Sequence, residues 1–366
     1  MERRRFVRSV MSLAGGALVA ACGERTSAAA PAPGVRRVMP DEGDPHRRTW
    51  MAFGVSDRVW EPAQVPVVQR NLAAIAKAVA RFEPVTMLVR PAERDLARGL
   101  LGDAEVELVA TELDDLWLRD TGPVFVTGGA AVDFNFTGWG GKQQHSNDRR
   151  LAGLVTARAG ARAVHTGLVL EGGAIEVDGE GTAIITESCV LNRNRNPGLS
   201  KEDVEDRLGG LLGLEKIIWL PGIAGHDITD GHTDFYARFA GPGVVVAGLD
   251  PDPGSYDHEV TRRHLEILRS ASDARGRELR VEVIEAPTRL RREPAGPDFA
   301  AGYVNFYLCN GGVLAPEFGD PEADAAALAT LRRLFPDREV VQLDIDGIAS
   351  GGGGIHCTTQ QEPALR

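Results

Sequence analysis

The stretch AIEVDGEGTAIIT, Ala174 to Thr186, has the pattern of a β-hairpin, because two apolar β-forming runs flank the turn Asp178-Gly179-Glu180-Gly181. Beyond it, Ser200 is suited to cap a helix that reaches Leu212. A third apolar run, Lys216–Leu220, completes the unit. We call this order of strand, turn, strand, helix and strand a ββαβ module, and its recurrence along the chain predicts the fold.

Three further copies of the module show the same order of elements. Their predicted hairpins span residues 124–136, 235–249 and 303–316. The helices that follow end near Gly160 or extend over residues 258–274 and 321–335. Each copy then closes on a short strand, at Ala163, 280–285 or 339–343.

The remaining pieces lie at the two ends of the chain. They are a strand near Trp50, a helix over residues 67–81, a strand at Val85–Val89 and a C-terminal segment, 355–359. These pieces form a fifth module only if the chain ends meet, which closes a ring without exposed strand edges. We therefore predict an α/β fold in which residues 39–366 form a single domain, a pseudo-symmetric propeller of five ββαβ modules. A doubly wound parallel sheet is the competing fold, and it explains the hairpins poorly.

The first 22 residues have the composition of an export signal. Arginines at positions 3–5 precede Phe6 and an apolar run, 10–21, that is too short to span a bilayer comfortably as a helix. The paired arginines resemble a twin-arginine signal, and Val19-Ala20-Ala21-Cys22 resembles a lipoprotein cleavage box. We expect a signal peptide over 1–22, lipidation of Cys22, a flexible tether over 23–38, and a periplasmic or cell-surface location. An unprocessed N-terminal segment is the alternative.

The bulk composition narrows the class of partner. A formal net charge of −11 argues against nucleic acid and anionic membrane surfaces as partners, because both need a basic protein surface. Of the four cysteines, Cys189 and Cys309 lie in apolar strand-like segments and are expected in the core. Whether these two pair is left open, as is the oligomeric state.

A residue able to do chemistry stands beside the glycine that precedes the hairpin in several modules. Equivalent positions in a ring face its axis, so these residues are expected to converge on one central pocket. They are Asp120, Glu171, His232, Asp234 and Cys357.

The combination of carboxylates with a thiol narrows the chemistry. Carboxylates raise the pKa of a neighbouring cysteine and repel an anionic intermediate, which argues against an ordinary protease or esterase. A planar cation resolves the conflict, because an aspartate can accept two hydrogen bonds from a guanidinium and the bound cation then favours the thiolate. The set predicts a guanidinium trap with the thiol aimed at the central carbon, and this chemistry requires no metal and no organic cofactor.

Each residue also has a structural interpretation. Asp120 and the run Glu171-Gly172-Gly173 are both compatible with ordinary turns. The cluster of two histidines and three aspartates over residues 226–234 is a candidate metal site, although it lacks the ligand spacing of common zinc sites. Cys357 is the hardest to explain structurally, because the four glycines before it allow a close backbone approach that a core strand does not need.

Longer motifs surround these residues and resemble a known family over residues 39–363. The family comprises the agmatine deiminases and the related bacterial-type peptidyl-arginine deiminases, within the amidinotransferase-like superfamily. The motifs that carry the resemblance include Met39-Pro40-Asp41-Glu42, Trp117-Leu118-Arg119-Asp120-Thr121-Gly122-Pro123, Trp139-Gly140-Gly141-Lys142, Glu171-Gly172-Gly173, Gly231-His232-Thr233-Asp234, Tyr303-Val304-Asn305-Phe306-Tyr307 and Gly352-Gly353-Gly354-Ile355-His356-Cys357.

The resemblance implies a pentein-like propeller and a role for each candidate residue. Cys357 is implied as the nucleophile, His232 as the general acid and base, and Glu171 as the partner of His232. Asp120 and Asp234 are implied as the holders of the guanidinium. Trp117 and Trp139 are candidates to stack on the cation, and Arg119 is a further candidate for substrate binding.

The resemblance also implies the reaction, hydrolytic deimination of a small guanidinium substrate. Agmatine, converted to N-carbamoylputrescine and ammonia in polyamine metabolism, is the expected substrate. Peptidyl or free arginine is the nearest alternative, and a non-catalytic polyamine- or arginine-binding lipoprotein and a metallohydrolase are the others. Two departures from the family pattern, Phe53-Gly54 in place of Trp-Pro and Ala174 in place of Ser, concern the pocket rim and the grip on the substrate tail.

Overall fold

Five separate β-sheets carry the fold. A computed structural model of the chain describes residues 36–55, 59–291, 296 and 298–364, and all five sheets belong to one unit, residues 34–366. Four sheets have three strands, in which an antiparallel hairpin is extended by a parallel third strand. This is the strand order of the predicted module, so the five-module fold is confirmed. The predicted signal peptide and residues 23–35 of the predicted tether lie outside the described residues.

The four three-stranded sheets follow the predicted boundaries to within a few residues: β5 ends three residues before the predicted Phe136, β10 begins two residues after the predicted Phe235, and two further departures have a structural reason. Residues 303–306, predicted as strand, precede the first strand of their hairpin, because the side chain of Asn305 bonds to the backbone of a distant turn. Helix α8 (His258–Ser270) ends four residues before the predicted end at Ala274, because an isolated bridge between Ser272 and Glu278 follows it. The strands are β4 (Val124–Val126), β5 (Ala130–Asp133) and β6 (Arg162–His165); β7 (Ile175–Val177), β8 (Thr182–Thr186) and β9 (Lys216–Leu220); β10 (Ala237–Gly241), β11 (Val244–Leu249) and β12 (Arg280–Glu285); and β13 (Tyr307–Cys309), β14 (Gly312–Glu317) and β15 (Glu339–Asp344).

The fifth sheet joins the two ends of the chain. Strand β16 (Thr359–Pro363) pairs antiparallel with β1 (His46–Phe53), and β1 pairs parallel with β2 (Val85–Val89). The predicted ring closure is therefore confirmed, with the C-terminal strand a few residues later than expected. A fourth strand, β3 (Val106–Ala110), extends this sheet and was not predicted.

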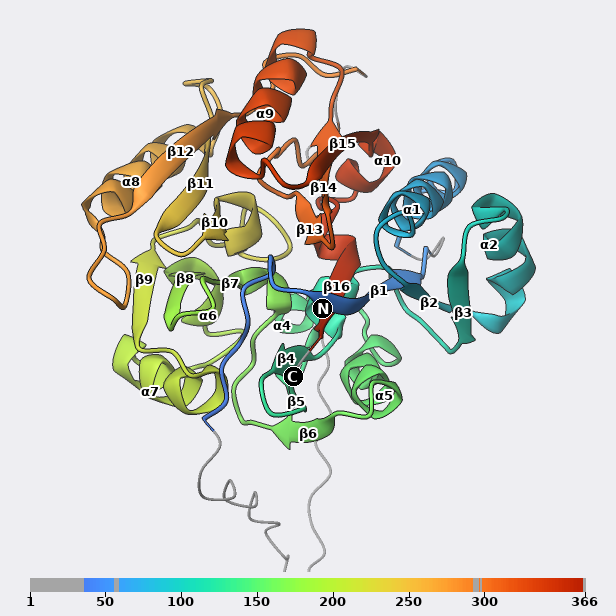
Figure 1. Cartoon of the computed structure of the whole chain (residues 1–366), viewed down its shortest axis with the longest axis horizontal. Coiled ribbons are helices and arrows are strands. Elements are labelled where there is room, and N and C mark those ends of the chain that lie inside the picture. The colour runs from blue at the N-terminus through green and yellow to red at the C-terminus, as the bar shows by residue number, and fades with distance from the viewer. Residues whose placement is uncertain (1–35, 56–58, 292–295, 297, 365–366) are drawn as a thin grey trace, which may run out of the picture. The chain divides into compact units, whose positions relative to one another are not determined.

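The longer helices lie on the outside of the ring of sheets, and the first strand of each hairpin lies nearest its centre (Figure 1). Local signals set several helix ends: Ser200 and Asp203 form a capping box at the start of α7, and Asp320 caps α9 ahead of Pro321. Among the described residues, no helix has both the length and the apolar character needed to cross a membrane. The helices are α1 (Val65–Val79), α2 (Arg94–Leu101), α3 (Leu118–Thr121), α4 (Gly138–Gly141), α5 (Leu151–Arg158), α6 (Glu187–Val190), α7 (Lys201–Leu212), α8 (His258–Ser270), α9 (Pro321–Leu334) and α10 (Asp346–Ala349).

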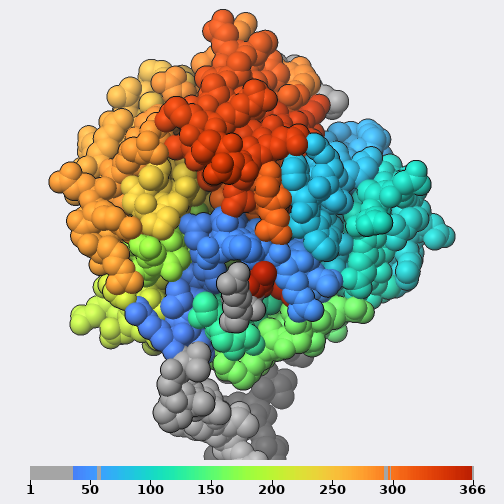
Figure 2. All heavy atoms as spheres, in the orientation of Figure 1, coloured from blue at the N-terminus to red at the C-terminus, as the bar shows by residue number. Residues whose placement is uncertain are grey.

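A segment before β1, residues 36–45, which we call the N-terminal strap, passes over the middle of the ring. In Figure 2 it lies in blue across the centre of the face in view. Backbone bonds fix its first part, since Met39 N donates to Leu212 O at 2.9 Å and Thr127 N donates to Val38 O at 2.8 Å. The strap therefore holds its side chains against the ends of several modules.

Candidate active site

The predicted site residues occupy short helical turns just before the first strand of a module. Asp120 lies in α3 ahead of β4, Glu171 precedes the 3-10 turn Gly172–Ala174 ahead of β7, and His232 precedes the turn Thr233–Phe235 that contains Asp234. Cys357 lies in the turn His356–Thr358 ahead of β16. The structure thus brings residues from four modules to equivalent positions.

Gly173 marks the point where these side chains meet. A methyl carbon built on Gly173 lies 2.7 Å from His232 Nδ1, 3.0 Å from Asp120 Oδ1 and 3.0 Å from Asp234 Oδ2. A side chain at position 173 would therefore collide with three polar groups at once. Because Gly173 has no side chain, the two carboxylates and the imidazole can all approach its backbone closely.

Asp120 is held by groups close to it in the ring. Its Oδ1 accepts from Gly173 N at 3.0 Å and its Oδ2 accepts from Trp139 Nε1 at 3.0 Å. Burial raises the pKa of Asp120, and the neighbouring imidazole of His232 opposes that shift.

Asp234 is held by a histidine on the Cys357 turn. Its Oδ2 lies 2.7 Å from His356 Nδ1, and the other ring nitrogen of His356 lies 2.9 Å from Glu42 Oε2 in the N-terminal strap. Asp234 Oδ1, in contrast, is buried and has no hydrogen-bond partner among the residues that the structure describes. Although burial opposes it, the hydrogen bond from His356 lowers the pKa of Asp234, which favours the carboxylate.

The thiol of Cys357 is 7% exposed and faces Asp234 and Asn305. Its Sγ lies 3.6 Å from Asp234 Oδ2 and 3.4 Å from Asn305 Nδ2. Burial first, and the carboxylates of Asp234 and Asp120 second, raise the pKa of Cys357 well above its usual value. A cation between these carboxylates would cancel the second cause and favour the thiolate.

His232 lies between two carboxylates without a close hydrogen bond to either. Nδ1 is 3.7 Å from Asp120 Oδ1, and Nε2 is 3.6 Å from Glu171 Oε2 and has no hydrogen-bond partner. Burial opposes protonation, yet the charge of Asp120 and the nearby Cys189 and Glu171 raise the pKa of His232 well above its usual value. Arg195 fixes Glu171 from behind at 2.7 Å. The raised pKa favours the protonated imidazole.

Of the two predicted aromatic residues, Trp139 contacts Asp120, whereas Trp117 lies against the glycine run that precedes Cys357. Trp139 donates to Asp120 and is 2% exposed. Trp117 donates to Asp115 Oδ2 at 3.0 Å and stacks on Trp60 with ring centroids 6.0 Å apart. A methyl carbon on Gly353 would lie 2.1 Å from the Trp117 ring, so the glycine run before Cys357 allows the close backbone approach expected from the sequence.

Arg119 does not fit its predicted role in substrate binding. Its guanidinium donates to Glu42 Oε2 at 2.9 Å and to Gln361 Oε1 at 2.6 Å, and Nε donates to His356 O at 3.3 Å. All three nitrogens are therefore engaged with the protein, and the side chain is 2% exposed. Arg119 therefore connects the turn that contains Asp120 to Glu42 in the strap and to the turn that contains Cys357.

The histidine and aspartate cluster over residues 226–234 is not gathered around one point. His226 stacks on Tyr256 with centroids 4.6 Å apart, and Asp230 pairs with Lys142 and Arg195. In the part of the chain that the structure describes, the group whose ligand atoms lie within 4.8 Å of one another is Glu171, Cys189 and His232. The positions of these residues therefore do not favour the alternative of a metal site on the cluster. Cys189 and Cys309 are both free thiols, so they do not pair.

Two further polar residues belong to the site and were not among the predicted ones. Asn305, fully buried ahead of β13, occupies the equivalent position in the fourth module and bonds both Cys357 Sγ and the backbone nitrogen of His356. Glu42 reaches the site through His356. Both lie in the motifs of the family resemblance, but Asn305 falls within a segment with the pattern of a strand and Glu42 lies outside the predicted modules, so neither gives a local signal of chemistry.

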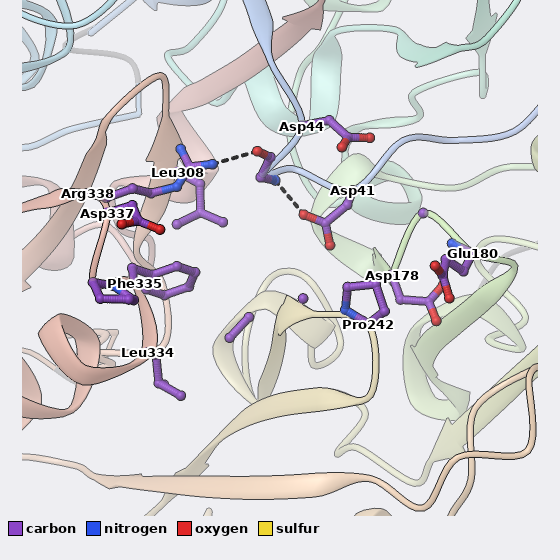
Figure 3. Close-up of a pocket in the computed structure, with 15 residues that line it drawn as sticks. Asp41, Asp44, Asp178, Glu180, Pro242, Leu308, Leu334, Phe335, Asp337 and Arg338 are labelled. Atoms are coloured by element: carbon purple, nitrogen blue, oxygen red, sulfur yellow. Dashed lines mark hydrogen bonds between the residues drawn. The ribbon is translucent and has the colours of Figure 1, made fainter.

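A pocket of about 390 Å³ lies elsewhere, between the strap and the ends of three modules (Figure 3). Asp41, Asp178 and Glu180 border one side and Phe335 and Arg338 the other. Arg338 donates to Gly43 O at 2.5 Å across its edge. None of its lining residues is a predicted site residue, so we do not assign the chemistry to it.

Several known proteins that are similar to this chain over most of its length are named as agmatine deiminases. An agmatine deiminase of Ectopseudomonas mendocina is 40% identical over 352 residues, which cover 89% of this chain and 95% of that protein. An agmatine deiminase of Pseudomonas aeruginosa is also 40% identical, over 90% of this chain and 96% of that protein. The solved structure of the agmatine deiminase of Enterococcus faecalis superposes with a TM-score of 0.84 at 32% identity and covers 90% of this chain and 96% of that one.

A model of the Porphyromonas-type peptidyl-arginine deiminase family matches residues 38–363, nearly the whole described chain. The matched span contains all five sheets and every residue of the site. The chain belongs to the Porphyromonas-type peptidyl-arginine deiminase family.

Proposed function

We propose that the protein hydrolyses agmatine to N-carbamoylputrescine and ammonia. The observation that carries the proposal is the convergence of the Asp120 and Asp234 carboxylates on Gly173, with the thiol of Cys357 3.6 Å from Asp234. Two buried carboxylates suit a small planar cation, because its nitrogens can donate hydrogen bonds to both. The relatives named as agmatine deiminases support this substrate.

In the first half of the proposed reaction, ammonia leaves. Asp120 and Asp234 accept hydrogen bonds from the guanidinium nitrogens, and the cation lowers the pKa of Cys357. The Cys357 thiolate attacks the guanidinium carbon and forms a C–S bond. His232 then gives its proton to the nitrogen that departs, so ammonia leaves and an S-alkylthiouronium remains.

In the second half, water completes the hydrolysis. Neutral His232, aligned by Glu171, removes a proton from water as the water oxygen attacks the same carbon. The C–S bond breaks as the oxygen of the adduct loses its second proton to solvent, so the thiolate returns and the ureido product leaves. One water is consumed, and one ammonia and one proton are released, so atoms and charge balance without an oxidant or a reductant.

A substrate panel tests the proposal directly. Ammonia release is measured with agmatine, free arginine and an arginine-containing peptide, at equal concentrations. We expect agmatine to give the highest kcat/KM. Absence of turnover with agmatine would falsify the proposal, and binding of agmatine by calorimetry without any product would point to a binding protein instead.

Peptidyl arginine is the second candidate, because the family model carries that description. The two substrates differ in the groups that flank the guanidinium tail, since agmatine has a free amine where a peptide has backbone on both sides. A peptide kcat/KM above that of agmatine would favour this candidate. The thiol chemistry is the same for both.

We also propose that the protein is exported and tethered through Cys22, which lies outside the described residues. The support is the order of arginines, apolar run and small residues before Cys22 in the sequence. Mass spectrometry of the mature N-terminus should find a lipidated Cys22, and Cys22→Ala should move the protein from the membrane fraction to the soluble fraction. A mature protein that retains Met1 contradicts the proposal.

A further inference from the structure

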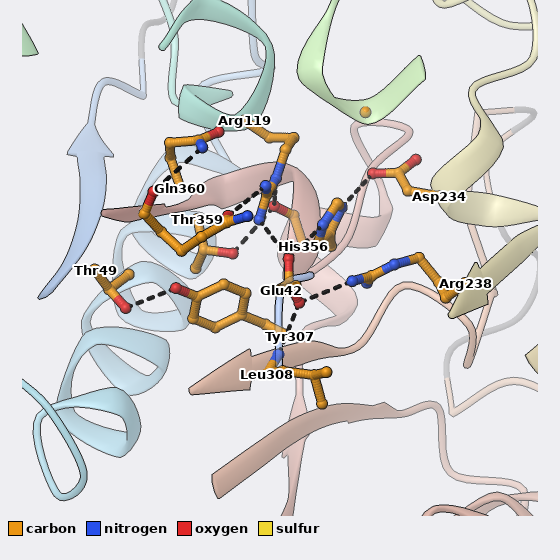
Figure 4. A network of polar contacts seen from close by, with 12 residues as sticks. Glu42, Thr49, Arg119, Asp234, Arg238, Tyr307, Leu308, His356, Thr359 and Gln360 are labelled. Atoms are coloured by element: carbon orange, nitrogen blue, oxygen red, sulfur yellow. Dashed lines mark hydrogen bonds and ion pairs between the residues drawn. The ribbon is translucent and has the colours of Figure 1, made fainter. Parts of the chain in front are cut away.

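Glu42 in the N-terminal strap is a junction of four modules. Its Oε1 accepts from Arg238 Nη2 at 2.8 Å and from Leu308 N at 2.9 Å, and its Oε2 faces Arg119 Nη2 and His356 Nε2, each at 2.9 Å. Figure 4 shows these partners converging on the carboxylate from different elements. Both oxygens are thus fixed in direction by charged or backbone donors.

His356 transmits this fixed position to Asp234. Each ring nitrogen faces a carboxylate oxygen, Asp234 Oδ2 at 2.7 Å and Glu42 Oε2 at 2.9 Å, and the imidazole is 1% exposed. The backbone nitrogen of His356 is also held, because it donates to Asn305 Oδ1 at 3.0 Å. The ring therefore cannot turn without breaking two short polar contacts.

The surroundings leave little room for another arrangement. The cavity next to Glu42, bordered also by Arg119, Glu176 and His356, has a volume of about 10 Å³, close to the minimum for one water molecule. Arg238, fully buried, closes the far side with bonds to Glu176 Oε2 at 2.8 Å and Phe306 O at 2.6 Å. Because Arg238, Glu42, His356 and Asp234 contact one another in series, none of them can move without displacing its neighbour, and Asp234 keeps its position relative to the strap.

We propose that Glu42 and His356 are positioning residues that orient the Asp234 carboxylate for a guanidinium ligand. With Oδ2 fixed by His356, the unpartnered buried Oδ1 is left to accept from the cation. This inference rests on the proposed function, in which Asp234 holds the guanidinium. Neither residue touches the substrate in this account.

Two substitutions at position 356 separate the two contacts of the ring. The amide nitrogen of Asn stands close to the place of Nδ1, so His356→Asn keeps a donor for Asp234 and loses the contact with Glu42. The amide nitrogen of Gln reaches the place of Nε2, so His356→Gln keeps the contact with Glu42 and loses the donor for Asp234. Because both variants exchange a buried imidazole for an amide, each is the control for the other.

The experiment measures the Kd of guanidinium ion from the concentration at which it half-maximally changes the rate of Cys357 alkylation by iodoacetamide, with the modified peptide identified by mass spectrometry. We expect His356→Asn to give a Kd within about threefold of the wild type, and His356→Gln to raise the Kd by roughly ten- to a hundredfold, the loss typical of one hydrogen bond to a charged group. Equal Kd values in the two variants, or a wild type whose alkylation rate does not respond to guanidinium, overturns the inference. Ammonia release from agmatine is measured in parallel, and a wild type that binds guanidinium but releases no ammonia refutes only the proposed function.

The contact between Glu42 and His356 is tested with Glu42→Gln. Because Glu42 faces two buried guanidinium groups, this variant is expected to melt at a lower temperature, and its Kd for guanidinium is measured below that temperature. If Glu42 acts through His356, the increases in Kd for Glu42→Gln and His356→Gln combine to less than their product in the double variant. Increases in Kd that multiply in the double variant contradict an action of Glu42 through His356. If Glu42→Gln does not fold, the comparison of His356→Asn with His356→Gln still tests the contact between His356 and Asp234.

Discussion

Two groups of side chains in the molecule have the same composition, a cysteine, a carboxylate and a histidine, but differ in how the histidine is held. In the first, Cys357 Sγ lies 3.6 Å from Asp234, whose partner is His356. In the second, Cys189 Sγ lies 3.6 Å from Glu171, whose neighbour is His232. His356 makes short contacts from both ring nitrogens, whereas the nearest carboxylates of His232 are 3.6 and 3.7 Å away.

The two histidines therefore have different functions in this account: His356 positions a carboxylate, and His232 transfers protons. The histidine next to the thiol in the sequence, His356, is committed to two carboxylates, and burial with the nearby arginines lowers its pKa. The distant His232 has an unpartnered nitrogen and a raised pKa, the properties of an acid ready to act. The thiols differ likewise, since Cys357 is 7% exposed and Cys189 is fully buried.

Substitution of each of the two cysteines by serine, one at a time, should give the largest difference in kcat between the two groups. Cys357→Ser should lower kcat by about four orders of magnitude or more, because the nucleophile is lost. Cys189→Ser should keep kcat within about tenfold, because this thiol makes no bond to the substrate in the proposed mechanism. Ammonia release from agmatine measures both, and comparable turnover by Cys357→Ser would contradict the comparison.

The two histidines should also differ in their effect on turnover. His232→Ala should lower kcat by roughly 10²- to 10⁴-fold, because both proton transfers lose their carrier. His356→Asn, which keeps a donor for Asp234, should lose less. Steady-state kinetics on agmatine checks the order, and a larger loss of kcat in His356→Asn than in His232→Ala reverses the assignment.

The point shared by Asp120, Asp234 and His232 is tested by Gly173→Ala. The added methyl lies within 3.0 Å of all three, so kcat/KM should fall by about 10²-fold through displacement of the site. Gly153→Ala is the matched control: its methyl meets no atom within 4 Å, and in the interior of α5 it should raise stability by about 0.5–1 kcal/mol. Equal activity in the two variants would show that turnover does not depend on the close approach at Gly173.

The smallest expected effect concerns the pKa of Cys357. Burial and the two carboxylates raise it, so the protein without substrate should hold a neutral thiol at neutral pH. Asp234→Asn removes one negative charge and should lower the pKa of Cys357, so the thiolate forms at lower pH than in the wild type. The ultraviolet absorbance of the thiolate, with Cys357→Ser as reference, follows the titration; an unchanged or higher pKa in Asp234→Asn contradicts the electrostatic account.

The fold was largely predictable because each module is a local pattern. Hairpin turns and the capped helix at Ser200 depend on neighbours in sequence, and ring closure followed from the leftover pieces. The strand Val106–Ala110 was missed because it forms no hairpin and belongs to an extra extension of the fifth sheet. Residues 303–306 were read as strand although the tertiary bonds of Asn305 hold them in another conformation.

The site was predictable only as far as glycines marked it. Asp120, Glu171, His232, Asp234 and Cys357 each stand near a glycine before a hairpin, and the structure brings them together. The role predicted for Arg119 was wrong because its partner, Glu42, lies far away in sequence. The support of Asp234 by the strap is a property of the closed ring, and no local pattern expresses it.

The central claim is that carbon–sulfur chemistry at Cys357 proceeds between carboxylates that hold a planar cation. Intact-protein mass spectrometry after rapid acid quenching of enzyme mixed with agmatine tests it most directly. We predict a transient adduct with the mass of agmatine less ammonia, located on the peptide that contains Cys357. Steady release of ammonia with no adduct at this residue at any mixing time, or an adduct on Cys189, contradicts the account.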